Sequence, residues 1–219
     1  MNLKAVIFDF DGVCIDTERA RFRSWQMIYE SYGFELPRDE WIKNIGTTSW
    51  VSDPFTILEK LTGKTLSRDK CNTMHRVNEM EIANSFSLQP GLTDRLNEAR
   101  ERGIPCAVAS SSSHRWVDGH LIRRGIKHFF TATVCKEDTM VHKPDPRPYL
   151  LALERLHAAA ADTVAIEDSP VGIASARAAG IYCIAVPCSM TKGMDFSAAQ
   201  RIVGSLEEVS FSEFSTAPL

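Results

Sequence analysis

Two aspartates near the N terminus, Asp9 and Asp11, are spaced as a carboxylate pair that could act in one site. They follow the apolar run Leu3 to Phe8, and ligands of an open parallel sheet bind outside the carboxyl ends of its strands. Gly12 allows a sharp turn directly afterwards, so both carboxylates can face one crevice. Two adjacent acids repel each other unless a cation neutralises them, and Mg²⁺ combines carboxylates with water and phosphate oxygens. The pair therefore predicts a divalent metal site at the end of the first strand.

Further polar groups follow later apolar runs and could complete that site. Glu167 and Asp168 come directly after the run Thr163 to Ile166, and they form a second carboxylate pair at a predicted strand end. The serine run Ser110 to Ser113 follows another apolar run and supplies hydroxyl and backbone donors. Lys143, in His-Lys-Pro-Asp-Pro, adds a cation that can contact carboxylates or phosphate. Such a set could hold a metal ion together with an anionic substrate group.

The elements that must position these residues are short apolar runs separated by stretches of helical period. The runs are Leu3 to Phe8, Ile104 to Ala109, Thr131 to Val134, Thr163 to Ile166 and Ile181 to Val186. Runs without polar alternation suit strands that are covered on both faces, and strand-helix alternation indicates a doubly wound parallel sheet. The segment Gly91 to Gly103 and the segment Ser169 to Gly180 both read as helices that end at glycine. We therefore expect an α/β core with a Rossmann-like, doubly wound parallel sheet.

The segment from Thr17 to about Leu88 shows no convincing strand pattern, and it is too long for a simple crossover between two strands. The apolar stripe of its first helix consists of Phe22, Trp25, Ile28, Tyr29 and Tyr32. Ser67 can cap a further helix. These features predict an inserted all-helical cap domain at residues 17–88, with residues 1–16 plus 89–219 forming the core.

Composition excludes several classes of protein. Lys and Arg number 25 against 28 Asp and Glu, so the net charge of -3 lacks the basic excess that nucleic-acid binding needs, and we expect no nucleic-acid partner. The six cysteines form no CxxC pair, which indicates reduced thiols, and the six histidines lack zinc-ligand spacing. Only the apolar residues Ala5 to Phe8 precede the first aspartate, too few for a signal peptide or a membrane span. We expect a cytoplasmic protein without membrane association.

Four ordered motifs resemble those of the haloacid dehalogenase-like hydrolase superfamily, in the branch that contains β-phosphoglucomutase and small sugar-phosphate phosphatases. The motifs are FDFDGVCIDTE (Phe8 to Glu18), ASSSS (Ala109 to Ser113), Lys143-Pro144 and IEDSPVGIASARAAG (Ile166 to Gly180). The resemblance covers essentially the whole chain. It implies a Mg²⁺-dependent phosphatase with a helical cap over an α/β core.

The resemblance also implies a division of roles among the site residues. Asp9 would be the nucleophile that takes up the phosphoryl group, and Asp11 would be the general acid and base and would bind the metal through its carbonyl. The Mg²⁺ ligands would be Asp9, Asp11, Glu167 and Asp168, although Glu167 could instead support the site indirectly. Ser110 and Lys143 would hold the phosphoryl group. Hydrolysis of a phosphate monoester needs acceleration worth on the order of 20 kcal/mol, and cancelling the anionic charge supplies part of it.

Other polar residues near these motifs have competing structural roles. Asp16 is typical of a helix cap, and Thr17 either shares that role or contacts the substrate. Ser111 is expected at the substrate, whereas the two serines after it fit a polar turn whose last residue caps the next helix. Trp25 belongs to an apolar stripe that suits core packing, yet it lies near the hinge and is a candidate substrate contact.

The branch contains both phosphatases and mutases, and this chain departs from the mutase pattern. β-Phosphoglucomutase keeps a histidine and an arginine in its cap for a second phosphate, and those places fall here near Arg21 and Ser49. Ser113 and His114 stand where the mutase has a phosphate-binding lysine and a polar partner. These departures favour a phosphatase acting on a small phosphorylated metabolite, with a mutase as the alternative. A dehalogenase is disfavoured because such relatives lack the second aspartate, here Asp11.

A catalytically silent binding protein is a further alternative, and the motifs disfavour it. Such a protein is expected to have lost at least one of the four motifs, and all four are present. Substrate selection is expected to lie in the cap, because a mobile lid meets the leaving group above a shared catalytic site. We expect a monomer whose cap opens and closes.

Overall fold

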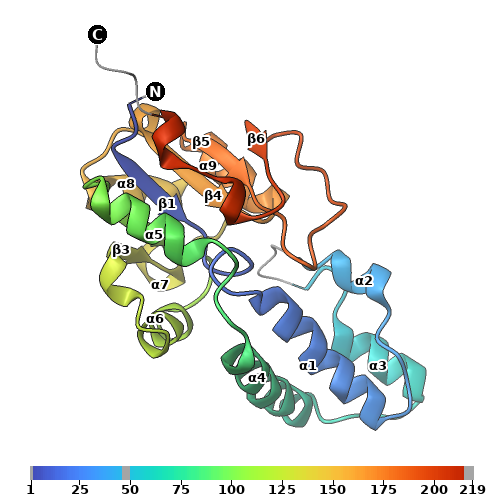
Figure 1. Ribbon diagram of the computed structural model, residues 1–219. Helices are drawn as coiled ribbons and strands as arrows, with labels where there is room; N and C mark the ends of the chain where they lie inside the picture. Colours follow the sequence, from blue (N-terminus) through green and yellow to red (C-terminus); the bar gives the residue numbers. More distant parts are fainter. Residues whose placement is uncertain (1, 46–49, 215–219) are drawn as a thin grey trace.

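A computed structural model of the chain describes residues 2–45 and 50–214. Among these residues, six parallel strands form one sheet in the order β3-β2-β1-β4-β5-β6 (Figure 1). The strands are β1 (Ala5–Phe8), β2 (Cys106–Ala109), β3 (Phe130–Val134), β4 (Thr163–Glu167), β5 (Tyr182–Ala185) and β6 (Arg201–Ile202). The predicted doubly wound α/β sheet is confirmed. The strand order changes direction beside β1, between β1 and β4, which is where ligands bind in such sheets.

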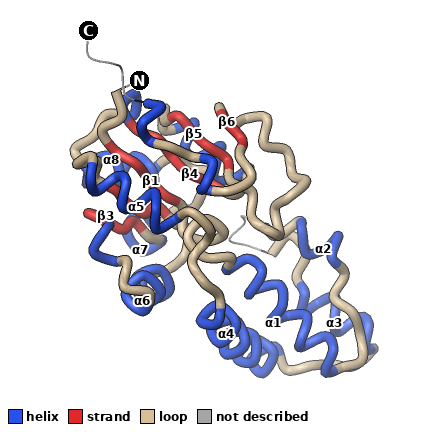
Figure 2. The backbone as a smooth tube through the Cα atoms, in the orientation of Figure 1, coloured by secondary structure: helices blue, strands red, loops and turns tan. Residues whose placement is uncertain are grey.

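The helices fall into two groups. The α-helices are α1 (Thr17–Ser31), α2 (Arg38–Ile42), α3 (Pro54–Thr62), α4 (Arg68–Ser85), α5 (Leu92–Glu101), α6 (His114–Arg123), α7 (Lys136–Thr139), α8 (Arg147–Leu156) and α9 (Pro170–Ala178). Short 3₁₀ turns are η1 (Lys127–Phe129), η2 (Ala160–Asp162), η3 (Leu206–Glu208) and η4 (Phe211–Phe214). Helices α5 to α9 surround the sheet, whereas α1 to α4 lie together beyond one end of it (Figures 1 and 2). None of the helices in the described ranges combines the length and the apolar character that a bilayer crossing requires.

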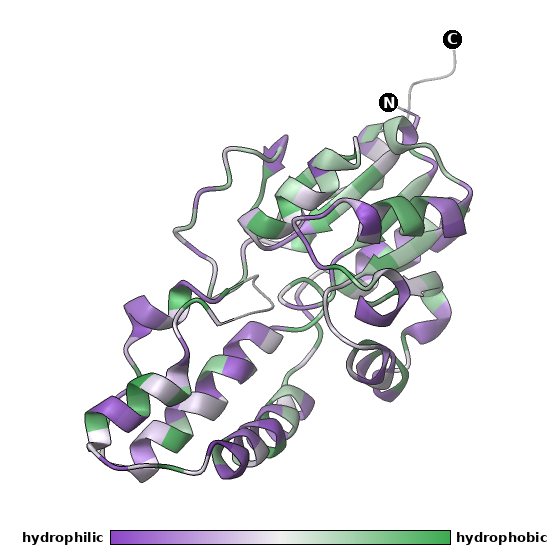
Figure 3. Cartoon of the chain, turned by 180° about the vertical axis from the view of Figure 1, so that it is seen from behind, coloured by the Kyte–Doolittle hydropathy of each residue, from purple (hydrophilic) through white to green (hydrophobic). Residues whose placement is uncertain are grey.

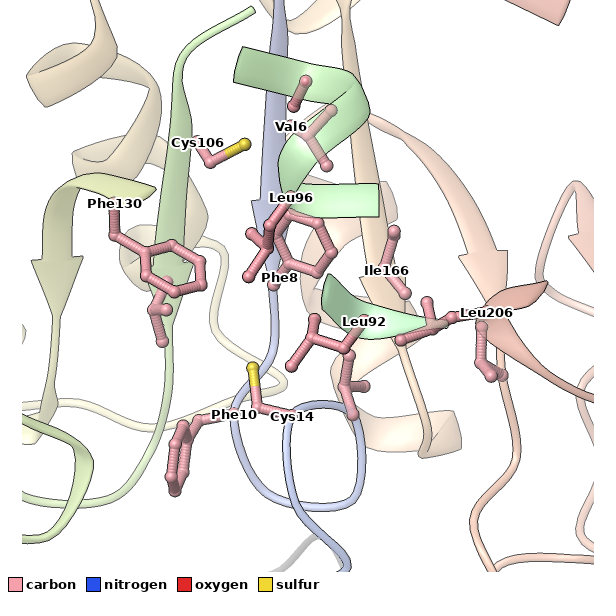
Figure 4. Packing of buried hydrophobic residues seen from close by; sticks show 14 of the residues in the cluster. Val6, Phe8, Phe10, Cys14, Leu92, Leu96, Cys106, Phe130, Ile166 and Leu206 are labelled. Carbon is pink, nitrogen blue, oxygen red and sulfur yellow. The ribbon is translucent and has the colours of Figure 1, made fainter. Parts of the chain in front are cut away.

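Both faces of the sheet are covered, which explains the continuous apolar runs. In β1, Val6 and Phe8 belong to the cluster that includes α5 and α6, while Ala5 and Ile7 belong to the cluster that includes α8 and α9. Figure 4 shows the first of these clusters, and the central strands of the sheet are coloured mostly hydrophobic in Figure 3. All four residues of β1 are fully buried. Polar alternation is therefore missing because no strand face of β1 meets water.

Side-chain caps fix the starts of several helices. The carboxylate of Asp16 accepts a hydrogen bond from the backbone N–H of Arg19 at the start of α1. The hydroxyls of Ser67 and Ser113 do the same at the starts of α4 and α6. The predicted capping roles of these three residues are confirmed. Each cap satisfies an amide that the helix itself leaves without a partner.

Helices α1 to α4, between β1 and α5, form an all-helical cap with a hydrophobic cluster of its own. Its largest buried side chains are Trp25, Tyr29, Trp41, Phe55 and Leu58. Helices α1 and α4 pack along each other, and α4 is coloured mostly hydrophilic in Figure 3. The predicted insertion of helices is confirmed, and the described part of this segment contains no strand.

The loop that follows β5 also contacts the cap. Cys188 and Met190 are buried in the same cluster as the cap side chains. Between them, the hydroxyl of Ser189 donates to Asp16 Oδ2 at 2.6 Å. The loop leads to β6, which the sequence did not predict because two residues, one of them Arg201, carry no strand pattern. Core and cap are therefore joined by packing as well as by the chain itself.

Candidate active site

Asp9 follows β1 and contacts Lys143 directly. Its backbone N–H donates to the carbonyl of Ile166 in β4, which extends the strand pairing by one residue. The ammonium of Lys143 lies between two carboxylates, in contact with Asp9 Oδ1 and 2.6 Å from Glu167 Oε1. Burial raises the pKa of Asp9, and the charge of Lys143 opposes that rise. Burial alone would lower the pKa of Lys143, but the charges of the two carboxylates outweigh this effect and raise that pKa. A buried cation is thus fixed beside Asp9.

Glu167, the last residue of β4, is held by partners from several directions. Tyr149 of α8 donates its hydroxyl to Glu167 Oε1 at 2.6 Å, on the same oxygen that Lys143 contacts. The backbone N–H of Asp168 lies 3.2 Å from Glu167 Oε2. A Cβ at Gly172 would overlap this carboxylate, so α9 packs directly against it. The sequence did not predict Tyr149, because its position six residues after Lys143 carries no chemical signature.

Three carboxylates meet where β1 and β4 end. Asp9, Glu167 and Asp168 each offer an oxygen atom, and these atoms lie within 4.8 Å of one another. Asp168 Oδ2 is buried and has no hydrogen-bond partner in the described part of the protein. Burial raises the pKa of Asp168, and the charges of Asp9 and Glu167 raise it further. Such a group of hard oxygen ligands fits a divalent cation of the Mg²⁺ type, which would satisfy the free oxygen and offset the repulsion.

Four donors converge on the carboxylate of Asp11. Thr17 Oγ1 and Trp116 Nε1 donate to Oδ1 at 2.6 and 2.9 Å. Ser112 and Ser110 donate their hydroxyls to Oδ2 at 2.6 and 3.3 Å. Asp16, and not Thr17, caps α1, so Thr17 is free to bind Asp11. Ser112 was predicted to belong to a polar turn, but its hydroxyl faces this carboxylate. Trp116 had no signal in the sequence, because α6 brings its indole to Asp11 only in the folded chain.

A cavity of about 980 Å³ opens above these residues, between the cap and the carboxyl ends of the strands. Of the predicted site residues, it is lined by Asp9, Asp11, Thr17, Ser111, Lys143 and Asp168. Ser110 and Glu167 lie behind this lining, with 1% and 0% of their surfaces exposed. Ser111 Oγ accepts a hydrogen bond of 3.3 Å from the backbone N–H of Lys143, which joins the second and third motifs. The residues of all four motifs therefore meet at one cavity.

Residues 6–186 match the family model of the haloacid dehalogenase-like hydrolases. The chain belongs to this family. It is 35% identical to YhcW of Bacillus subtilis, a protein named as a candidate phosphatase, over 96% of this chain and 95% of that protein. It is 31% identical to the phosphorylated carbohydrates phosphatase of Thermotoga maritima, over 82% of each chain. A solved structure of a candidate β-phosphoglucomutase from Thermotoga maritima matches with a TM-score of 0.79 and 29% identity, over 94% of this chain and 96% of that one.

One position that the sequence singled out lies away from the cavity of this hydrolase, and another is not described. Trp25 was a candidate substrate contact, but it is 1% exposed and packs in the cap cluster, where its ring lies 6.2 Å from Trp50 and 5.2 Å from His75. Its side chain does not line the cavity, because α1 turns it toward α4. Ser49, one of the positions compared with the mutase, lies outside the described residues.

Proposed function

We propose that this hydrolase is a Mg²⁺-dependent phosphatase that releases phosphate from a small phosphorylated metabolite, with sugar phosphates as the substrate class. One observation carries the proposal: Asp9 contacts Lys143 at the floor of the cavity, beside Asp168, whose Oδ2 is free of partners among the described residues. The relatives named as phosphatases, one of them for phosphorylated carbohydrates, support this class. We also propose a cytoplasmic monomer.

The proposed metal site uses the carboxylates at the ends of β1 and β4. Asp9 and Asp168 offer the more available oxygens, because Glu167 Oε1 already accepts from Lys143 and Tyr149. Asp11 would contribute its backbone carbonyl, and Glu167 would support the site from behind. A bound Mg²⁺ would supply positive charge beside the phosphoryl oxygens.

In the first step, the carboxylate of Asp9 attacks the phosphorus atom. A bond forms between Asp9 and phosphorus while the bond from phosphorus to the ester oxygen breaks, which gives an aspartyl-phosphate. Asp11, in its protonated form, gives its proton to the leaving oxygen, so a neutral alcohol departs. The ammonium of Lys143 offsets the negative charge of the phosphoryl group as it approaches Asp9.

In the second step, a water molecule attacks the aspartyl-phosphate. Asp11, now ionised, takes a proton from that water as its oxygen bonds to phosphorus, and the bond between Asp9 and phosphorus breaks. Inorganic phosphate leaves, Asp9 is again a carboxylate and Asp11 is again protonated. Thr17, Ser112 and Trp116 hold the Asp11 carboxyl group in place between the two steps.

A mutase of the β-phosphoglucomutase type is the alternative, and the geometry gives it less support. Such an enzyme must hold the second phosphate of a bisphosphate. Ser113 is used as the cap of α6, and the ring of His114 is paired with Asp118 at 2.8 Å and with Asp138 at 2.7 Å. Neither residue is therefore available to a phosphate in this arrangement.

The test is a screen of sugar phosphates, nucleotides and small organic phosphates, with phosphate release measured in the presence of Mg²⁺ and of EDTA. We expect release from some esters, loss of that release in EDTA, and a fall of about 10³-fold or more for Asp9→Asn. Asp94→Asn is the matched control, because Asp94 is exposed on α5 and should leave the rate unchanged. Retained turnover in Asp9→Asn would exclude the assigned nucleophile. Isomerisation of β-glucose 1-phosphate that depends on a bisphosphate would favour the mutase.

A further inference from the structure

The side of the cavity that the cap forms carries more acid than base. Its charged residues come from α1 and α4, which lie next to each other in Figure 1, and we call them the cap wall: Glu18, Arg21, Arg76, Glu79 and Glu81. Three carboxyl groups thus stand beside two guanidinium groups. With this mixture of acids and bases the wall offers no excess positive charge to a second anionic group on the substrate, whereas a neutral polar group can pair with either kind of side chain.

Arg21 is held at the centre of the cap wall. Its guanidinium lies 4.5 Å from the ring centroid of Trp50 and 3.9 Å from Glu18 Oε1. The charge of Arg21 also lowers the pKa of Glu79, so Arg21 acts on both acids. The single positive charge of Arg21 is therefore shared between Glu18 and Glu79, and it does not fully neutralise either carboxyl group.

Glu18 keeps hydrogen-bonding capacity that no described residue uses, and Glu79 is near only a neutral histidine. Glu18 Oε2 is buried and has no partner within the described ranges, which costs free energy until a donor or acceptor arrives. Glu79 Oε2 lies 3.6 Å from His75 Nε2, but burial lowers the pKa of His75 to about 3, so the imidazole is neutral. The other ring nitrogen of His75 bonds to the hydroxyl of Ser24. Glu79 therefore has no ion pair with His75.

The protonation of Glu18 and Glu79 suits a hydroxyl ligand. Burial raises the pKa of each carboxyl group to about 7, an effect that Arg21 opposes and the charge of Asp11 strengthens. Near neutral pH, both the protonated and the ionised forms are present, so these groups can donate as well as accept hydrogen bonds. A hydroxyl group also donates and accepts, which makes it a match for this wall.

We propose that Glu18, Arg21 and Glu79 bind the hydroxyl groups of a neutral, polyhydroxylated leaving group, and that sugar and polyol monophosphates are the preferred esters. This inference rests on the proposed phosphatase function, to which it adds the recognition residues and the preference for a neutral leaving group. Arg115 and Lys136 line the core side of the cavity and are exposed. If the enzyme bound a second anionic group, these two cations, and not the cap wall, would contact it.

The first test compares esters of equal chain length on the wild-type protein. Sorbitol 6-phosphate and hexyl phosphate differ in their hydroxyl groups, and fructose 1,6-bisphosphate adds a second anion. We expect kcat/KM for sorbitol 6-phosphate to exceed that for hexyl phosphate by about 100-fold, because buried polar groups reject a ligand that leaves them unpaired. The bisphosphate should be turned over more slowly than the monophosphates of hexoses.

The second test uses Glu18→Gln and Glu79→Gln, which change charge and acceptor strength with little change in shape. We expect each to lower kcat/KM for sorbitol 6-phosphate by about 10-fold or more, mainly through KM, since a lost hydrogen bond to a charged group has that effect. Turnover of hexyl phosphate should change by less than about 3-fold in the same variants. Glu35→Gln is the matched control, because Glu35 is an exposed cap residue outside the cavity.

Binding to Asp9→Asn separates this inference from the proposed function. Calorimetric titration of that variant with sorbitol 6-phosphate and with hexyl phosphate needs no turnover, and we expect tighter binding of the polyol ester. Hydrolysis of both esters at equal kcat/KM would overturn the inference and leave the phosphatase intact. Absence of hydrolysis of any ester would overturn the phosphatase, and equal binding of both esters would then overturn the inference too. A preference for the bisphosphate, or for ethanolamine phosphate, would show that the wall selects a charged group instead.

Discussion

The floor of the cavity consists of Asp9, Asp11, Lys143 and Asp168 at the strand ends, and it faces the cap wall. The two surfaces hold their polar groups in different ways. On the floor, Asp11 accepts four hydrogen bonds and Lys143 contacts two carboxylates. On the wall, Glu18 Oε2 has no partner in the described chain and Arg21 is shared between two acids. Groups that are fixed before the substrate arrives suit the chemical step, which gains from preorganised charge. Polar groups that lack a hydrogen-bond partner suit substrate selection, because they favour a ligand that forms the missing hydrogen bonds.

Removal of the floor cation should have the largest effect. In Lys143→Met, Asp9 and Glu167 lose their shared partner, so we expect kcat to fall by about 10³-fold and the free energy of unfolding to fall by about 3–5 kcal/mol. Phosphate release and urea unfolding at pH 8 measure the two effects. Lys60→Met, at an exposed position of α3, serves as the control. Near-normal kcat in Lys143→Met would show that the floor does not depend on this charge.

Glu79 of the cap wall should make the free energy of unfolding depend on pH. The pKa of Glu79 is raised from 4.5 to about 7, mainly by burial, with Arg21 opposing and Asp11 and Glu18 adding to the rise. The folded state therefore binds this proton more tightly than the unfolded state, and its stabilising contribution is complete below pH 4.5 and lost as pH rises through 7. A difference of this size corresponds to about 3 kcal/mol.

The measurement is the free energy of unfolding of the wild type minus that of Glu79→Gln, from urea titrations between pH 4 and 8. We expect this difference to fall by about 3 kcal/mol across the range, because glutamine does not titrate. Glu35→Gln, at an exposed cap position, is measured in parallel as the control. A difference for Glu79→Gln that stays constant with pH would contradict the burial of this carboxyl group in the wall.

The smallest predicted effect tests how tightly the floor is packed. Gly12 and Gly33 have similar left-handed φ values of 87° and 80°, so alanine at either position should cost about 1–2 kcal/mol of stability. A Cβ at Gly12 would overlap the carboxylate of Asp168, whereas a Cβ at Gly33 meets nothing within 4 Å. We therefore expect Mg²⁺ binding, measured by calorimetry, to weaken by about 10-fold in Gly12→Ala and to stay unchanged in Gly33→Ala. Equal Mg²⁺ affinity in both variants would show that Asp168 adjusts freely.

Much of the floor could be predicted because its residues follow strands, and apolar runs mark where strands end. Asp9 follows β1, the serine run follows β2, and Glu167 and Asp168 close or follow β4, so parallel topology alone brings them to one edge. The same reasoning predicted the five longer strands and the insertion of helices. The catalytic and metal-binding roles of these residues stay predictions until the variants are measured.

The other residues of the site depend on contacts between separate elements, and no local sequence pattern encodes such contacts. Trp116 reaches Asp11 from the first turn of α6, and Tyr149 reaches Glu167 from α8, yet both read as ordinary aromatic residues of amphipathic helices. Ser112 and Ser113 are neighbours of the same type, but one binds Asp11 and the other caps α6. Trp25 had two predicted roles, core packing and substrate contact, and the structure places it in the core of the cap.

The loop after β5 has a consequence for how far the cap can move. The chain passes between sheet and cap twice, at residues 15–17 and 86–90, and the buried side chains of Cys188 and Met190 add a third, noncovalent attachment. Because these side chains are buried among cap residues, a rotation of the cap would either move this part of the loop with it or remove the two side chains from the cluster. The loop between β5 and β6 is therefore a tether whose length would limit how far the cap could move from the sheet while Cys188 and Met190 stay buried.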